Sequence, residues 1–287
     1  MTFYSPLRYP GGKGKLVNYF KTLFEKNSLD GGIYVEPYVG GASIALSLLI
    51  EGYASKIIIN DKDKSIYAFW YSAINYPKEL CNLIKKTPVN ISVWEMQKKI
   101  QKNKESFNFE KKSDLLKLGF STFFLNRTNR SGILNAGVIG GKYQKGKWKI
   151  DARYNKEDLI QRIKKISLHK AKIKLFNEDA LELIKNLNKK LPSNTLIYLD
   201  PPYYVKGKEL YMNYYSDEDH KKISEEINKT KKQKWIITYD NVDFIKKLYE
   251  DNLQTNYNLY YSAGKSKHGS ELIIFSDNLK IIKPMEN

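Results

Sequence analysis

Cysteine is nearly absent from this chain, and its scarcity excludes several kinds of site at once. The only cysteine is Cys81, so neither a disulfide framework nor a cysteine-based zinc cluster can form within the chain. Residues 1–6 lack the apolar core of a secretion signal. The longest apolar stretch, Ala42 to Ile50, is much too short to span a bilayer. We therefore expect a cytoplasmic protein without a membrane partner.

Arginine is scarce as well, although the chain is strongly basic. Lysine and arginine number 49 against 31 acidic residues, which gives a formal net charge of +18. This excess favours a polyanionic partner, although codon bias toward lysine would produce the same surface. Only five of the basic residues are arginines. Two of these, Arg127 and Arg130, lie in one motif, which codon bias explains less well.

Strand and helix patterns alternate at both ends of the chain. Ile33–Glu36 and Lys56–Asn60 are typical of strands, and Ala42–Leu49 between them is typical of a helix, which together indicate a parallel βαβ unit. The alternation of strand and helix patterns returns later in the chain. Strands are expected at residues 173–176, 196–199, 234–238, 258–262 and 271–275. Helical, lysine-rich segments occupy the middle. We predict an α/β domain of residues 1–65 and 170–287, interrupted by a mostly helical insertion of residues 66–169.

The most informative segment follows the last apolar residue of a predicted buried strand. Its sequence is Asp200, Pro201, Pro202 and Tyr203. Because proline fixes φ and lacks an N–H, the loop is rigid and its carbonyl groups stay free to accept hydrogen bonds. One carboxylate and one carbonyl can then hold a flat amino group beneath an aromatic ring. The segment favours binding of a planar nitrogen nucleophile; the alternative is a structural turn without chemistry.

A glycine turn near the beginning of the chain offers a second candidate site. Glu36 ends a predicted strand, and Gly40 and Gly41 let the main chain approach a ligand before the next helix begins. Glu36 suits a charged or polar small molecule and would repel a pyrophosphate. Asp61, after the following strand, is placed to accept ribose hydroxyls. The alternative is an ordinary tight turn of an α/β protein.

Another glycine-rich segment, Arg8-Tyr9-Pro10-Gly11-Gly12-Lys13-Gly14-Lys15, opens the chain. No strand precedes it and neither of its lysines is followed by Ser or Thr, so it does not fit a phosphate-binding P-loop. A loop that covers a bound small molecule fits better, with Lys13 as a cation and Tyr9 as a stacking ring. A flexible basic arm is the alternative.

Taken in order, these motifs resemble the Dam-like adenine-specific DNA methyltransferases. The matching segments are Tyr9–Lys13, Glu36–Gly41, Asp61, Phe124–Ile133 and Asp200–Tyr203, and they extend over most of the chain. The resemblance implies a Rossmann-like methyltransferase sheet that carries an inserted target-recognition domain. It implies S-adenosylmethionine as the methyl donor, with S-adenosylhomocysteine as product and no metal. It also implies a bacterial, archaeal or phage origin.

The resemblance also assigns residues to the donor and to catalysis. The cofactor-binding residues that it implies are Tyr9, Gly12, Lys13, Glu36, Pro37, Tyr38, Gly40, Gly41, Ala42, Ser43, Asp61, Asp179 and Asp200. The implied catalytic residues are Asp200, Pro201, Pro202 and Tyr203. The target adenine leaves the duplex, because its amino group is otherwise paired. Tyr203 then stacks on the base, while Asp200 and the Pro201 carbonyl accept the two amino hydrogens.

The segment in the insertion is expected to contact DNA. Arginine pairs with guanine and asparagine with adenine in the major groove. The expected DNA-binding residues are Asn126, Arg127, Asn129, Arg130 and Asn135. Arg127 has the alternative role of anchoring the insertion. Thr128 and Arg130 stand where GATC-methylating members have aromatic residues, and Asn135 where they have an arginine, so the recognition sequence stays open.

Double-stranded DNA is therefore the expected partner, with a cognate restriction endonuclease as a further one. RNA or another nucleic acid as methyl acceptor is the alternative within the same chemistry. A non-catalytic DNA-binding relative is the alternative outside it.

Overall fold

The alternating patterns at both ends of the chain form strands of one sheet. The strands are β1 (Gly32–Glu36), β2 (Ala54–Asn60), β3 (Ile173–Phe176), β4 (Thr195–Leu199), β5 (Lys234–Asp240), β6 (Gln254–Tyr261) and β7 (Lys267–Phe275). The computed structural model describes residues 3–8, 13–205, 215–261 and 267–282. The expected strands are confirmed, although β6 begins at Gln254 instead of Asn258 and β7 at Lys267 instead of Glu271.

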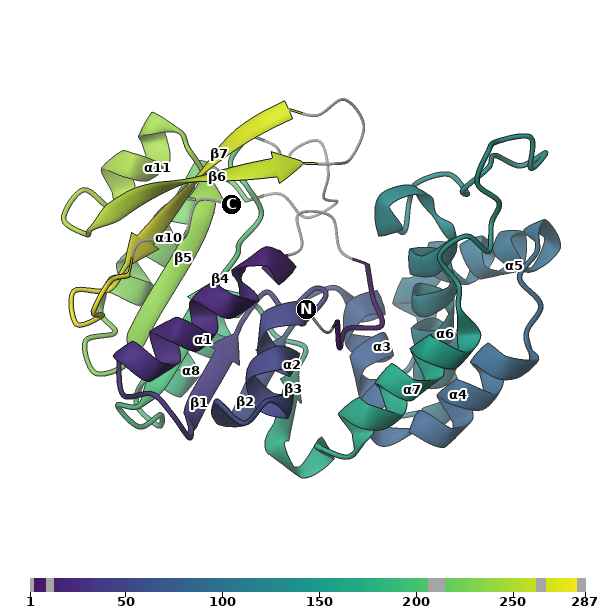
Figure 1. Ribbon diagram of the computed structural model, residues 1–287, viewed down its shortest axis with the longest axis horizontal. Helices are drawn as coiled ribbons and strands as arrows, with labels where there is room; N and C mark the ends of the chain where they lie inside the picture. The colour runs from purple at the N-terminus through teal and green to yellow at the C-terminus, as the bar shows by residue number, and fades with distance from the viewer. Residues whose placement is uncertain (1–2, 9–12, 206–214, 262–266, 283–287) are drawn as a thin grey trace.

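The sheet has the strand order β3-β2-β1-β4-β5-β7-β6 (Figure 1). Strands β1 to β5 are parallel, whereas β7 pairs antiparallel with both β5 and β6. This is the doubly wound Rossmann order with β7 added between β5 and β6. The predicted α/β class is confirmed, and the parallel βαβ units lie where the alternation indicated them.

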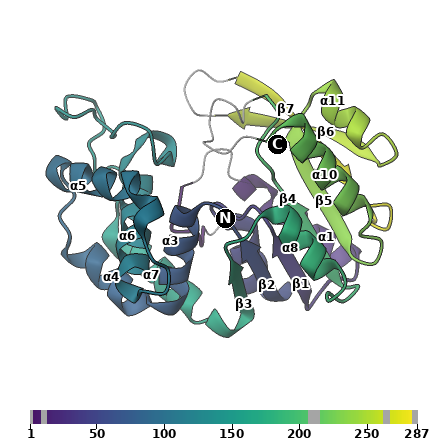
Figure 2. The same ribbon diagram turned by 180° about the vertical axis from the view of Figure 1, so that it is seen from behind.

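Two hydrophobic cores lie on opposite faces of the sheet, because successive side chains of a strand point to opposite sides. Tyr34 and Ile57 belong to the first core, whereas their neighbours Val35 and Ile58 belong to the second. The helices that cover these faces are α1 (Val17–Lys26), α2 (Ser43–Ile50), α8 (Ala180–Asn188), α10 (Asp217–Asn228) and α11 (Asp243–Leu248). Helices α1 and α2 pack on the first core, and Figure 2 shows α8, α10 and α11 on the other side.

The chain between β2 and β3 forms the helical part beside the sheet (Figure 1). Its helices are α3 (Lys64–Asn75), α4 (Pro77–Lys86), α5 (Ile91–Lys102), α6 (Lys112–Thr128) and α7 (Lys156–Ser167). Short 3-10 turns are η1 (Lys13–Leu16), η2 (Lys104–Ser106), η3 (Arg130–Gly132) and η4 (Lys170–Lys172). A Cβ on Gly119 of α6 would lie 2.5 Å from the Ala68 carbonyl oxygen, so the close packing of α3 on α6 requires glycine there.

The first core continues from the sheet into this helical part. Phe20 of α1, Phe69 of α3 and Phe123 of α6 belong to one cluster of buried side chains. The division into a domain of residues 1–65 and 170–287 and an insertion of residues 66–169 therefore stays a prediction, although the helices occupy the expected segment.

Residues 135–149 form a loop of turns that contains no strand. Its backbone is held by Gln144, whose amide donates to the Ile139 carbonyl at 2.8 Å and accepts from the Ile150 N–H at 2.8 Å. Within the described ranges, no helix combines the length and apolarity needed to cross a membrane.

Candidate active site

Three carboxylates meet where parallel strands of the sheet end. Glu36 is the last residue of β1, and Asp61 and Asp200 directly follow β2 and β4. Strands β2, β1 and β4 are neighbours and run parallel, so their carboxyl ends share one edge. This edge is where open α/β sheets bind ligands. The expectation that Glu36, Asp61 and Asp200 share a site agrees with this placement.

Glu36 is a buried carboxylate whose hydrogen bonding is incomplete. The residue is 5% exposed, and its Oε2 atom has no hydrogen-bond partner among the described residues. Burial raises the pKa of Glu36 well above its ordinary value, and the nearby charges of Asp200 and Asp61 raise it further. A positively charged ligand would satisfy the orphaned oxygen and offset the repulsion.

Asp61 holds the glycine turn in place. Its Oδ2 accepts the Gly40 N–H at 3.0 Å, and its Oδ1 accepts the Asp63 N–H at 2.9 Å. Gly40 has a φ of 42° and Ala42 a φ of 51°, in the left-handed region that glycine tolerates best. Burial, followed by repulsion from Asp63, raises the pKa of Asp61 to about 7. The carboxylate thus fixes the turn and keeps lone pairs for a ligand.

Asp200 is held from two sides. Its Oδ1 accepts the Thr238 hydroxyl at 2.7 Å and lies 3.4 Å from the Lys13 ammonium. Lys13 is buried and also donates to Glu271 at 2.8 Å. Burial raises the pKa of Asp200; Lys13 opposes this effect, while Glu271 adds to it. For Lys13, burial lowers the pKa, but Asp200 and Glu271 together raise it above its ordinary value.

The loop after Asp200 is anchored at both ends. Tyr203 places its hydroxyl between Lys13 and Glu271, and the Lys13 ammonium lies 5.0 Å from the centre of the Tyr203 ring. Asp240, the last residue of β5, accepts the N–H groups of Tyr204 and Val205 at 2.8 Å each. Pro201 is buried and Pro202 half-buried. The two anchors fix the segment that the prolines already stiffen.

The other residues expected at the donor site surround this edge. The Pro37 carbonyl accepts the Asn60 amide at 2.9 Å, and the Tyr38 hydroxyl lies 3.0 Å from that of Tyr215. Gly41 is buried, and Ser43 begins α2. Asp179 caps α8 by accepting the Leu181 N–H at 2.9 Å, and it pairs with Lys62. Tyr9 and Gly12 lie outside the described residues.

Two of the asparagines expected to contact DNA point into the protein. Asn126 is 1% exposed. Its side-chain oxygen accepts the Arg8 N–H at 2.7 Å, and its amide nitrogen donates to the carbonyls of Arg8 at 2.6 Å and Gly132 at 2.9 Å. Asn129 is fully buried; its amide donates to the Ile133 and Leu134 carbonyls, and its oxygen accepts the Trp94 indole N–H at 2.6 Å. In this structure both amides hold a turn and present no surface to base edges.

The other three expected DNA contacts differ in exposure. Arg127 is partly buried, and its Nε donates to the Pro6 carbonyl at 2.6 Å, which agrees with the alternative of an anchoring role. Arg130 and Asn135 are exposed at the end of α6 and in the following loop. A base-reading role therefore remains a prediction for these two residues.

Sequence reasoning missed Thr238, Glu271 and Asp240. Each is a polar residue within or at the end of a strand that contains an apolar run, which is the one signal that the sequence offered. In the structure each is at most 7% exposed. Asp240 and Glu271 are register partners in the β5–β7 pairing. Across the parts of the chain that the structure describes, no group of three or more His, Cys, Asp or Glu side chains is arranged to hold a metal ion.

Comparison with known proteins agrees with this geometry. The sequence model of the D12 class N6 adenine-specific DNA methyltransferases matches residues 9–266. Type II methyltransferase M.MjaIII of Methanocaldococcus jannaschii is 24% identical over 261 residues, which cover 85% of this chain and 87% of that protein.

Two solved structures are more remote. The SAM-dependent methyltransferase from Agrobacterium tumefaciens aligns over 91% of this chain and 61% of its own, with 9% identity and a TM-score of 0.38. The rRNA methyltransferase aviRa from Streptomyces viridochromogenes aligns over 91% of this chain and 85% of its own, with 9% identity and a TM-score of 0.36.

Proposed function

This chain belongs to the D12 class N6 adenine-specific DNA methyltransferase family, and from that premise we propose that its carboxylate edge is the catalytic centre. Membership makes the chain a site-specific DNA adenine methyltransferase and implies S-adenosylmethionine as its methyl donor. The observation that supports the proposed location is the orphaned, buried Glu36 oxygen beside Asp200 and Asp61. A donor that carries both a sulfonium and an ammonium charge matches this uncompensated acidity.

The carboxylate edge would hold the donor through several contacts. Glu36 would accept from the ammonium group, because its free Oε2 needs a donor in a buried place. Asp61 would accept ribose hydroxyls with the lone pairs that Gly40 and Asp63 leave unused. The bound donor supplies an electrophilic methyl group on its sulfonium sulfur. No metal is required for this chemistry.

The rigid loop would position the acceptor. The Asp200 carboxylate and the Pro201 carbonyl would accept the two hydrogens of the adenine amino group, which directs the nitrogen lone pair toward the methyl group. Tyr203 would stack on the extruded base, a contact worth roughly 1–3 kcal/mol. Thr238 and Lys13 hold the Asp200 carboxylate before the base arrives, so little reorganisation accompanies the reaction.

Duplex DNA would lie across the loop of residues 135–149 and the edge of the sheet. In both ribbon views this loop and the β6–β7 strands project from the same side of the molecule (Figures 1 and 2). The loop exposes Tyr143 and Trp148, whose exposed fractions are 88% and 62%. Lys142, Lys145, Lys147 and Lys149 surround them and are all exposed. Lysines that contact phosphates position DNA, while Arg130 and Asn135 are the candidates for reading bases.

A biological role in restriction and modification follows by analogy. The curated relative is named a Type II methyltransferase. We extend that role to this chain, with a cognate restriction endonuclease that cleaves the same, unmethylated sequence. The recognition sequence stays open.

Methylation by an Asp200→Ala variant tests the catalytic assignment. Tritium transfer from labelled donor to duplex DNA should be nearly lost, while donor binding measured by calorimetry is retained. Asp30→Ala, which removes an exposed acid before the amino end of β1, at the opposite end of that strand from Glu36, is the matched control. Near-normal turnover of the Asp200 variant would reject the mechanism, and absence of donor binding to the wild type would indicate a non-catalytic relative. Methylation-sensitive sequencing of DNA from expressing cells then gives the base and its context.

A further inference from the structure

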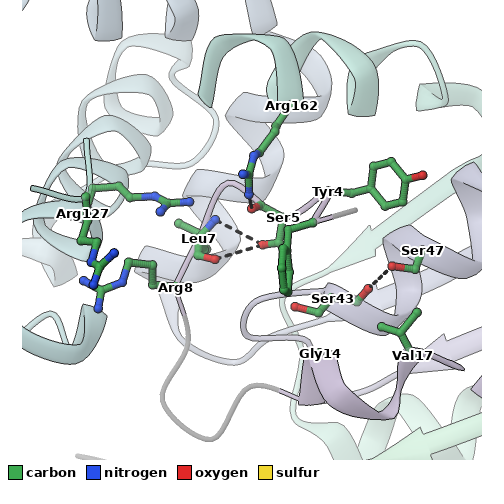
Figure 3. A pocket seen from close by; sticks show the side chains of 12 residues that line it. Tyr4, Ser5, Leu7, Arg8, Gly14, Val17, Ser43, Ser47, Arg127 and Arg162 are labelled. Atoms are coloured by element: carbon green, nitrogen blue, oxygen red, sulfur yellow. Dashed lines mark hydrogen bonds between the residues drawn. The ribbon is translucent and has the colours of Figure 1, made fainter. Parts of the chain in front are cut away.

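Four of the five arginines of the chain line one cavity, although the chain is otherwise rich in lysine. Arg8, Arg127, Arg153 and Arg162 line a space of about 450 Å³. Figure 3 shows the first two and Arg162 beside this space. We call this space the arginine pocket. Its lining does not include Glu36, Asp61 or Asp200; of the residues expected at the donor site it shares only Ser43.

The arginine pocket lies where the sheet meets the helical part. Residues 3–8 form one wall, and Ser43 and Ser47 of α2 contribute hydroxyl groups on the side of the sheet. Arg127 comes from α6 and Arg162 from α7, both in the helical part. A ligand bound here would therefore contact both parts of the molecule and the segment that precedes Lys13.

The positive charge of the pocket is poorly compensated. Among the described residues, only Arg162 has a carboxylate partner, Asp158 of its own helix at 2.9 Å. Burial, followed by repulsion from Arg162 and Arg8, lowers the pKa of Arg127 to about 9. Burial and Arg153 lower the pKa of Arg8. Cations that lower one another's pKa in this way are stabilised by a bound anion.

Structural anchoring explains only part of this arrangement. Arg127 donates to the Pro6 carbonyl, Arg162 to the Ser5 carbonyl at 2.9 Å and Arg8 to the Asn129 carbonyl at 3.4 Å. A guanidinium has five N–H donors, so most donors remain available. The Arg162 Nε is buried and has no partner in the described structure. Arg153 is exposed and makes no hydrogen bond or ion pair to the described residues, so anchoring does not account for its position.

We propose that the arginine pocket binds a phosphate-class oxyanion. Guanidinium groups suit this ligand because their paired N–H groups match the spacing of phosphate oxygens. The Ser43 hydroxyl adds a neutral donor, whereas the Ser47 hydroxyl already donates to the Ser43 carbonyl at 2.8 Å. The phosphate has two sources, a free phosphate or polyphosphate and a backbone phosphate of DNA. In either case it joins residues 3–8 to α6 and α7 and steadies the helical part against the sheet.

Thermal unfolding with added anion tests the proposal on the full chain. Sodium phosphate and pyrophosphate are compared with sodium chloride at matched ionic strength, and affinity is measured by calorimetry. Arg153→Gln removes one of the four guanidinium groups of the pocket without breaking a hydrogen bond or ion pair among the described residues, and should weaken anion binding at least tenfold. Lys190→Gln, which removes an exposed cation elsewhere, is the matched control and should bind the anion like the wild type.

A second arm distinguishes the two sources. If the phosphate belongs to DNA, Arg153→Gln weakens duplex binding, reduces its salt dependence, and free phosphate competes with DNA. If the anion is free, the variant loses phosphate stabilisation but binds DNA like the wild type. The proposal is overturned if phosphate stabilises the wild type no more than Arg153→Gln and both proteins bind DNA equally. Neither outcome depends on methyl transfer, so failure here leaves the catalytic assignment intact.

Discussion

The ammonium group of Lys13 lies 3.4 Å from the Asp200 carboxylate and 2.8 Å from the Glu271 carboxylate, so one buried cation joins two acids. The three residues come from η1, the end of β4 and the middle of β7. Lys13 lowers the pKa of Asp200, whereas Glu271 raises it. Burial is the largest cause and raises the pKa of Asp200, and these two residues then shift that pKa in opposite directions.

Substitutions of Lys13 and Glu271 should move the pH profile in opposite directions. Asp200 must be ionised to accept the adenine amino hydrogens, so kcat/KM rises with pH through its pKa. Lys13→Gln removes the charge that lowers this pKa and should move the acidic limb to higher pH. Glu271→Gln removes the charge that raises it and should move the limb to lower pH.

The measurement is kcat/KM from about pH 4.5 to 9, within the range in which the variants stay folded by circular dichroism. Breaking a buried ion pair costs roughly 3–5 kcal/mol, so thermal unfolding is recorded for both variants. If the acidic limbs of both folded variants moved in the same direction, or did not move, Lys13 and Glu271 would not control the pKa of Asp200.

Glu36→Gln should stabilise the protein and weaken donor binding. In the unfolded chain Glu36 ionises near its ordinary pKa, whereas the folded protein keeps its proton to a higher pH. The unfolded state therefore binds fewer protons in that window, and stability falls as pH rises from the unfolded toward the folded pKa. Glutamine does not ionise and avoids this loss.

Thermal unfolding without donor should give a higher Tm for Glu36→Gln at pH 7, and the difference should vanish near pH 4. Donor affinity should fall at least tenfold, because a charge-assisted hydrogen bond is worth about 1.5–3 kcal/mol. Glu25→Gln, at an exposed position on α1, is the control. An unchanged donor affinity would remove Glu36 from the donor site.

Thr238→Val should slow methyl transfer with little effect on donor binding. The hydroxyl donates to Asp200 at 2.7 Å and lies 2.9 Å from the Tyr198 hydroxyl. Valine has nearly the same shape and removes only these contacts. The Thr238 hydrogen bond lowers the pKa of Asp200. Its loss should therefore raise that pKa and move the acidic limb of the pH profile to higher pH.

We expect kcat to fall about 10–100-fold, which corresponds to an activation free energy higher by about 1.4–2.7 kcal/mol. Thr238→Ser restores the hydroxyl and should restore both kcat and the pH profile. A serine variant as slow as the valine variant would assign Thr238 to packing alone.

The strand-end acids were predictable because parallel strands end at one edge. Glu36, Asp61 and Asp200 each end or follow a recognisable apolar run, and the family resemblance assigned all three to the donor site, an assignment that stays a prediction. Glu271 was not predictable in the same way. Its position depends on β7 pairing antiparallel between β5 and β6, which no local pattern indicates.

The asparagines at the end of α6 and just after it show that residue type alone does not give a residue's role. An asparagine amide suits an adenine edge and a backbone turn equally well, so residue type did not distinguish the two roles. The structure does distinguish them, because Asn126 and Asn129 are almost completely buried while Arg130 is exposed. Burial in this segment depends on residues 5–8, which are far away in the sequence and pack against the end of α6.

Alanine variants of Asn126 and Arg130 should separate stability from DNA binding. Asn126→Ala leaves the Arg8 N–H, the Arg8 carbonyl and the Gly132 carbonyl without their partner, and each buried group left unpaired costs about 1–3 kcal/mol. Its Tm should therefore fall by several degrees. Arg130→Ala alters an exposed side chain and should change stability by less than about 0.5 kcal/mol.

For duplex binding the larger effect should come from Arg130→Ala and the smaller one from Asn126→Ala. With DNA affinity measured by fluorescence anisotropy from 50 to 200 mM salt, Arg130→Ala should bind more weakly because a cation near the bases or phosphates is lost. A salt slope smaller by about one unit would assign Arg130 to a phosphate, whereas an unchanged slope with relaxed sequence preference would assign it to a base. Folded Asn126→Ala should keep the wild-type slope, because its buried amide carries no charge toward DNA. A slope that changed in that variant and not in Arg130→Ala would contradict the roles that burial gives these two residues.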